Sequence, residues 1–167
     1  MDDENVAKAR EIIAKNRYLT LATSFHDIPW SAPVAYVVDD DYNFYFYSEM
    51  DSIHCTHLRQ NLLVAFAIFD STAESDVADG LQIAGKGNEV ERHSLARVTD
   101  LYWRQSFVSE TVRKRWMRPD EDFHYPANKR FYRIVPNRIY KLDQLSHLID
   151  QRIEIALRDL IKYPAHT

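Results

Sequence analysis

Hydrophobic and polar residues alternate with two different periods along the first fifty residues. Apolar side chains in residues 3–15 recur every three or four positions, which is the period of a helix. Three later segments are rich in β-branched and aromatic residues and end near turn-forming residues, a pattern that predicts strands. These segments are residues 18–24, 31–38 and 43–48. The acidic run 39–41 joins the last two, so we expect a hairpin there.

The rest of the chain mixes strand-like and helix-like stretches. Residues 51–60 are expected to form a helix, because Asp51 and Ser52 are both good N-caps. Residues 62–70 are apolar on both faces, so a strand at this position must be covered on both sides. The remaining expected elements are a fifth strand at 81–90, helices within 92–117, a sixth strand at 131–142 and an amphipathic helix at 144–163.

The order of these elements predicts an α+β fold. Six strands, with hairpins first and without a repeated strand–helix–strand unit, favour an antiparallel barrel with peripheral helices. Pro33 cannot donate to a strand ladder, so its strand is expected at an edge or a bulge. We expect one domain over residues 1–167, with the barrel core at about 17–91 and 130–142.

Composition and charge exclude several classes of protein. The chain has 167 residues, of which 46% are apolar, and this is enough for one buried core. No apolar run approaches the ~18 residues that span a bilayer, and the acidic start MDDENVAKAR does not resemble a secretory signal. We therefore expect a cytoplasmic protein without a membrane partner. A net charge of −4 argues against nucleic acid as the main partner, and the single Cys55 excludes an intramolecular disulfide.

Three local motifs suggest chemistry that their details do not support. The run Gly80–Gly87 is one residue away from a phosphate-binding loop, but Gly87 stands where a Ser or Thr would hold Mg²⁺. On a helix, His54 and His57 share a face from which Cys55 points away, so a polar helix end is favoured over a metal site. The basic run 113–118 is best explained as a solvated helix end.

The transition from the strand at 43–48 to the following helix is the best candidate for a binding site. Tyr47 and Ser48 end the strand, Ser52 opens the helix, and His54 lies in its first turn. Free N–H groups at a helix start, together with hydroxyls, attract a phosphate. Asp51 opposes an anion here, and a helix cap without a ligand is the alternative interpretation.

The ordered set of segments resembles the pyridoxamine 5′-phosphate oxidase-like family of FMN-binding split β-barrels. The resemblance rests on YLTLATS, on residues 29–70, on GLQIAGKGNEVE and, after the predicted helices, on FYRIVPNRIYKL. It implies a six-stranded split barrel that forms a homodimer and binds two FMN molecules in grooves between the subunits. FMN would carry the electrons, and the substrate would be a small redox molecule.

The resemblance also assigns residues to the cofactor. In the family, the matching positions contact the flavin ring, the strand end beside its phosphate, a Ser-Arg-Lys phosphate grip and a glutamine on the fifth strand. In this sequence they are Ser31, Ala32, Pro33 and Val34; Tyr47 and Ser48; Ser52, Ile53 and His54; and Gln82. The grip differs from the family pattern, because Ile53 replaces the arginine and His54, only partly charged at neutral pH, replaces the lysine. No Arg-x-His pair follows Arg138, which argues against pyridoxal phosphate synthesis.

Four interpretations of function remain open at this point. The first is an FMN-dependent oxidoreductase or reductase, and the second is a flavin- or haem-binding protein without turnover. The third is a deazaflavin-dependent reductase, and the fourth is a structural dimerisation module. The many aromatic residues favour a subunit interface or a ligand groove, and Trp103 and Trp116 could either cover a flavin or only pack their helices on the barrel.

Overall fold

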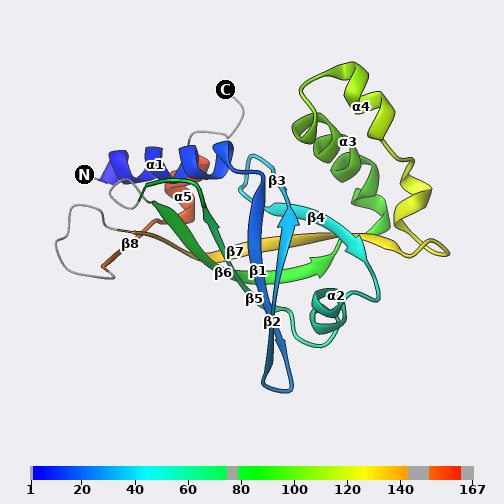
Figure 1. Ribbon diagram of the computed structural model, residues 1–167, viewed down its shortest axis with the longest axis horizontal. Coiled ribbons are helices and arrows are strands. Elements are labelled where there is room, and N and C mark those ends of the chain that lie inside the picture. Colours follow the sequence, from blue (N-terminus) through cyan, green and yellow to red (C-terminus); the bar gives the residue numbers. More distant parts are fainter. Residues whose placement is uncertain (1, 75–78, 143–150, 163–167) are drawn as a thin grey trace.

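A strongly curled antiparallel sheet forms the body of the protein (Figure 1). The computed structural model describes residues 2–74, 79–142 and 151–162. The path through the sheet is β2-β1-β5-β6-β7-β4-β3, and β8 adds to β7. The strands are β1 Tyr18–Phe25, β2 Ile28–Ala35, β3 Val37–Val38, β4 Phe44–Glu49, β5 Leu63–Phe69, β6 Gly80–Glu89, β7 Lys129–Leu142 and β8 Arg152–Glu154. The predicted α+β fold around an antiparallel split barrel is therefore confirmed.

Helices close the openings of the curled sheet. Apolar side chains alternate along each strand, so one face is buried and forms the main core, which includes Phe46, Phe66 and Ile83. In Figure 1, α1 and α5 lie together over one opening of the barrel and α2 lies at the opposite end. The α-helices are α1 Asp2–Lys15, α2 Ile53–Leu58, α3 Leu95–Ser106, α4 Glu110–Trp116 and α5 Leu157–Ile161. Short 3₁₀ helices occupy Arg92–Ser94 and Asp120–Phe123.

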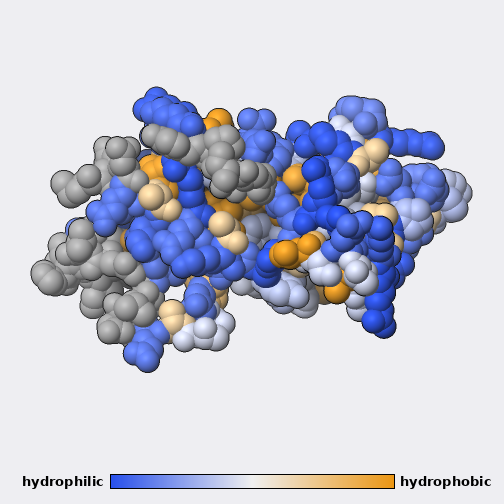
Figure 2. Space-filling model, turned by 90° about the horizontal axis from the view of Figure 1, so that it is seen from above, coloured by the Kyte–Doolittle hydropathy of each residue, from blue (hydrophilic) through white to orange (hydrophobic). Residues whose placement is uncertain are grey.

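The distribution of hydrophilic and hydrophobic residues on the surface is consistent with a core enclosed by the curled sheet and its helices. Figure 2 shows that the face seen from above is largely hydrophilic and that hydrophobic residues reach it only in small patches. Within the described residues, no helix combines the length and the apolar character that crossing a membrane requires.

The sheet has eight strands where six were expected, and one reason is a break in the predicted strand 31–38. β2 pairs with β1, whereas Val37 and Val38 pair with β4. The chain changes partner at Tyr36, whose backbone N–H donates to Arg17 O and whose hydroxyl donates to Ile13 O over 2.6 Å. These two bonds fix the turn between the two partners. β2 lies at the edge of the sheet, as the presence of Pro33 predicted.

The second correction concerns the predicted C-terminal helix 144–163. Residues 143–150 lie outside the described part of the chain, but Arg152–Glu154 form a strand and only Leu157–Ile161 are helical. β4 pairs with β7 only as far as Ile134, so the second half of β7 has backbone groups available for another strand. β8 satisfies these groups, while Ile155 is buried in the core. Pairing of β8 with β7 therefore outweighs the helical spacing of apolar residues in this segment.

The glycine-rich run 80–87 is a strand, as expected, and not a phosphate-binding loop. Gly85 lies where the register between β6 and β7 shifts. A Cβ on Gly85 would lie 2.5 Å from Val135 O, so the close approach of the two backbones requires glycine at this position.

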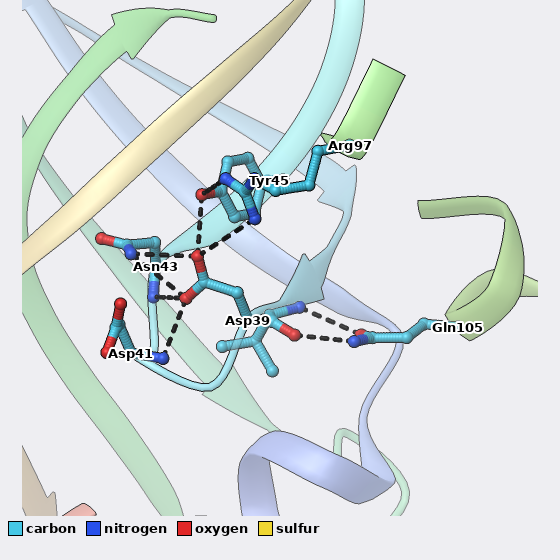
Figure 3. Close-up of polar contacts among 7 residues, drawn as sticks. Asp39, Asp41, Asn43, Tyr45, Arg97 and Gln105 are labelled. Atoms are coloured by element: carbon cyan, nitrogen blue, oxygen red, sulfur yellow. Dashed lines mark hydrogen bonds and ion pairs between the residues drawn. The ribbon is translucent and has the colours of Figure 1, made fainter. Parts of the chain in front are cut away.

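Helix α3 is fixed to the β3–β4 hairpin by partly buried polar contacts (Figure 3). The side-chain amide of Gln105 accepts from Val38 N at 3.1 Å and donates to Val38 O at 2.7 Å. The Asp39 carboxylate accepts from the hairpin residue Asn43 and from Tyr45 Oη at 2.8 Å. Arg97 of α3 donates to Tyr45 Oη at 3.0 Å and lies 3.9 Å from Asp39. One carboxylate therefore orders both the hairpin and the helix.

We expect Asp39→Ala to lower the free energy of unfolding by about 2–3 kcal/mol, because the buried Tyr45 and the half-buried Asn43 lose an ionised acceptor. Urea unfolding followed by circular dichroism measures the change. Asp40→Ala is the matched control, because the neighbouring Asp40 is exposed and should change stability by less than about 0.5 kcal/mol. Equal effects of the two substitutions would contradict the role given to Asp39.

Candidate functional site

Three of the predicted phosphate-site residues form one hydrogen-bonded cluster. Ser48 ends β4, Ser52 is the N-cap residue of α2, and His54 follows in the first turn. His54 Nε2 lies 2.8 Å from Ser48 Oγ and 3.3 Å from Ser52 Oγ. Ser52 Oγ also donates to Glu49 O at 2.8 Å. The three side chains therefore satisfy one another and the strand end.

Ser48 and Ser52 are half-buried, but the side chains of His54, Cys55 and His57 on α2 are buried, which corrects the expected polar helix end. His54 is 9% exposed, His57 is 8% exposed and Cys55 is fully buried. His57 Nδ1 lies 3.1 Å from Thr23 Oγ1. α2 closes the end of the barrel, and a helix in this position must bury one side. Among the described residues, no group of three or more His, Cys, Asp or Glu side chains could hold a metal ion.

Burial also removes the partial positive charge expected of His54. Desolvation lowers the pKa of His54 below its ordinary value, and the nearby His57 lowers it further. At neutral pH the imidazole is therefore neutral. Ile53, which is 45% exposed, brings no charge, and Arg59 donates to Met50 O and to Thr56 Oγ1. The cluster offers hydrogen bonds to a ligand but no cation of its own.

Tyr47 does not belong to this cluster. Neighbouring residues on a strand point to opposite faces, and Phe46 and Ser48 face the barrel interior and α2. Tyr47 instead packs on the outer face of the sheet, edge to face with Tyr102 and Phe131 at centroid distances of 5.2 and 5.4 Å. Its neighbours belong to a second core cluster, formed between α3 and the strands β3, β4 and β7.

Three other predicted residues lie on the part of this outer face that α3 leaves bare. Gln82, Ser31 and Pro33 are exposed there, whereas Ala32 and Val34 on the same strand point into the core. The pairing register places two rows of side chains across five strands. The first row is Pro33, Thr20, Ala67, Gln82 and Tyr140, and the second is Ser31, Ala22, Ala65, Ala84 and Arg138.

The part of these rows on β1, β5 and β6 forms the floor of an open groove of about 420 Å³, whereas Ser31, Pro33 and Arg138 do not line it. Its centre consists of Thr and Ala side chains, which leave the sheet surface flat and apolar. Tyr140 and Arg152 stand at one side of it. The groove can therefore accept a flat ring or the sheet of another subunit, with Gln82 as a polar contact.

A further pocket was not predicted as a site. It has a volume of about 300 Å³ and lies on the outer face between α3 and the start of β1. Tyr47 and Trp103 line it, and the sequence left open whether Trp103 only packs its helix. The helical spacing of aromatic residues in α3 is compatible with both roles, so the pattern alone could not identify a pocket.

The fold and the site together define a class of protein. A curled antiparallel sheet around a core, with helices at its openings and a bare outer face, is a split β-barrel. The family model described as pyridoxamine 5′-phosphate oxidase matches residues 6–143. The chain belongs to this family. No curated protein sequence matches the chain.

Several solved structures have the same fold. General Stress Protein 26 from Bacillus anthracis is 21% identical with a TM-score of 0.63, and the match covers 90% of this chain and 98% of that one. A FAD-binding protein from Mesorhizobium loti is 15% identical with a TM-score of 0.61, and 81% and 91% are covered. A haem-binding protein from Mycobacterium smegmatis is 17% identical with a TM-score of 0.69. That match covers 94% of this chain but only 60% of the haem-binding protein.

The lowered pKa of His54 predicts that acid destabilises the protein. Unfolding returns His54 to its ordinary pKa, so the unfolded state binds the proton more readily. The stability that neutral His54 contributes is therefore complete above about pH 6.5 and is lost as the pH falls through the folded-state pKa. Thermal melts between pH 5 and 8 should show a smaller acid-dependent loss of Tm for His54→Gln than for the wild type. His93→Gln, at an exposed position, is the control and should leave the pH profile unchanged.

Proposed function

We propose that the protein is a cytoplasmic homodimer that binds FMN and acts as an oxidoreductase on a small molecule. The observation that carries this proposal is the bare, flat groove on the outer face, which Gln82 lines, with Ser31 and Pro33 at the β2 ends of the same two rows of side chains. The family supports a flavin, and the Mesorhizobium loti protein with the same fold is a FAD-binding protein.

The ring end of a flavin suits this groove. Thr20, Ala22 and Ala65 present a surface without protruding side chains, on which a flat ring can lie. The Gln82 amide can donate to or accept from the polar edge of the ring. A bound flavin would supply hydride and electron transfer, while the protein holds and orients the ring. The groove is open on one side, so we propose that a second subunit covers it.

The phosphate of FMN would meet hydrogen-bond donors in this protein but no positively charged side chain. Ser48, Ser52 and His54 face α2 on the inner side of the sheet and do not line this groove, so we propose that they donate to the phosphate of a flavin whose ring lies in the groove of the second subunit, after giving up their bonds to one another. Neutral hydrogen bonds contribute about 0.5–1.5 kcal/mol net, whereas bonds to charged groups contribute about 1.5–3 kcal/mol. We therefore infer that the ring, rather than the phosphate, supplies most of the affinity.

Protein prepared with excess flavin should show the visible absorbance of an oxidised flavin, and FMN should raise its Tm. We expect FMN to bind no more than about tenfold more tightly than riboflavin, because the phosphate meets only neutral donors. Isothermal titration of both ligands measures the ratio. A haem Soret band, selective binding of a deazaflavin, or no binding of any of these ligands would each overturn the proposal.

The phosphate position has its own test. Ile53 is partly exposed, so Ile53→Arg can add a cation without burying it. This change should strengthen FMN binding by about tenfold and leave riboflavin unchanged, since only FMN carries the phosphate. Ile53→Gln is the uncharged control and should change neither. An equal effect on both ligands would place the phosphate elsewhere.

Dimerisation through the bare face predicts a sharp effect of charge at its centre. Ala65→Arg places a charged side chain on the flat floor, so the dimer should dissociate at micromolar concentration. Sedimentation velocity measures the change, and flavin affinity should fall with it. Ala7→Arg, at an exposed position on α1, is the matched control and should leave both unchanged. A wild-type monomer would contradict the composite groove.

A further inference from the structure

Another cavity lies between α1, the β3–β4 hairpin and the end of α3. Its lining comes from three separate parts of the chain, within residues 10–17, 36–42 and 104–108. Its volume of about 470 Å³ lies within the range of small-molecule sites. We name it the α1–α3 cavity. It shares no lining residue with the groove, so it is a separate place for a ligand.

The floor of the α1–α3 cavity is apolar and fixed in place. Ile13 and Val37 line it, and both are buried. Tyr36 lines it as well and donates its hydroxyl to Ile13 O over 2.6 Å. The side chain of Gln105 bonds both backbone groups of Val38 (Figure 3). These bonds fix the floor, so a compact apolar body can pack on it without rearranging it.

The charged residues of the lining are mainly cations. Three arginines and one carboxylate line the cavity, namely Arg10, Arg17, Arg104 and Glu11. The Glu11 carboxylate accepts from Lys8 and Lys15, and these two lysines lower the pKa of Glu11. Neither lysine lines the cavity. The charge of Glu11 is therefore offset outside the cavity, and it does not neutralise the arginines.

Arg17 carries the charge that a ligand could use most directly. Its Nη1 donates to the backbone carbonyl of Gln105 at 2.9 Å, and none of the described carboxylates forms an ion pair with it. Gln105 itself lines the cavity, so this bond holds the exposed Arg17 guanidinium at the cavity edge. A guanidinium has five N–H donors in a fork that matches a carboxylate. Most of these donors remain available to a ligand.

The alternative role of Arg17 is to offset the dipole of α3, because Gln105 lies in the last turn of that helix. The C-terminal end of a helix carries only about half a negative charge, so part of the Arg17 charge remains. Arg104 adds a second guanidinium. Its ion pair with Asp100 joins two side chains that are 62% and 61% exposed, and such a surface pair is weak enough to yield to a ligand. The cavity therefore favours an anion over a cation.

We propose that the α1–α3 cavity binds a small organic acid, whose apolar body packs on the floor and whose carboxylate pairs with Arg17 and Arg104. The acidic run 39–41 of the hairpin does not line the cavity, so it does not stand between the arginines and the ligand. Because the groove is separate, the site does not require a flavin and does not rest on the proposed function.

A matched pair of ligands tests the charge. 2-Naphthoate and 2-naphthamide have the same rings and nearly the same shape, but only the acid is charged. Equilibrium dialysis with the flavin-free full chain at low ionic strength should show that the acid binds about tenfold more tightly than the amide. High salt should reduce this difference, because exposed guanidiniums are screened.

Matched variants test the position. Arg17→Gln should reduce the preference for the acid to about twofold or less and leave the amide unchanged. Arg104→Gln should reduce it in part, and this variant keeps the bond between Arg17 and Gln105 O, so it tests the site even if Arg17→Gln disturbs α3. Arg92→Gln is the control, because it removes the same charge at an exposed position outside the cavity and should leave the preference unchanged.

The outcomes separate this inference from the proposed function. Equal binding of the acid and the amide, or a preference that survives both Arg17→Gln and Arg104→Gln, would overturn the cavity assignment even if the groove binds FMN. Displacement of 2-naphthoate by uncharged riboflavin would place the acid in the flavin site and would overturn it as well. A preference that depends on Arg17 and is unaffected by riboflavin would support it even if FMN does not bind.

Discussion

The outer face of the curled sheet is the constraint on which the rest of the structure depends. Curling buries one face completely, so any apolar residue on the other face needs a cover of its own. α3 supplies that cover over β3, β4 and β7, where it builds the second core cluster. It does not cover the central parts of β1, β5 and β6, whose outer side chains in the groove are Thr and Ala with Gln82. The edge of α3 therefore marks both candidate ligand positions on the outer face, because the pocket lies under the helix and the groove lies beyond it.

The position of α3 depends on few polar contacts. Gln105 bonds both backbone groups of Val38 at one end of the helix, and Arg97 reaches the Tyr45 hydroxyl and Asp39 near the other. Apolar packing alone would allow the helix to slide along the aromatic surface. Directional bonds fix its register, and with it the position of Trp103 in the pocket wall.

Much of the fold could be predicted from the sequence, because local patterns and tertiary structure agree along β1, β4, β5 and β6. The prediction from sequence was wrong where the spacing of apolar residues fits both a helix and a strand. The apolar residues after position 150 fit a helix, but the available edge of β7 selects a strand at Arg152–Glu154. The candidate site was only partly predictable for a related reason. Sequence proximity joined Tyr47 to Ser48, yet strand alternation sends their side chains to opposite faces. The charge of His54 depends on burial by α2, which no local pattern reveals.

Three of the places where a ligand could be held share one electrostatic property. The groove has Ala, Thr and Gln at its centre, the helix-start cluster has two hydroxyls and a neutral imidazole, and the pocket is lined mainly by aromatic residues. Each offers hydrogen bonds or apolar contact without an enclosed charge. A net charge of −4 adds a weak repulsion toward anions across the surface. The three places therefore offer a ligand a matching shape and neutral hydrogen bonds, and none of them has the paired cations of a charged phosphate grip.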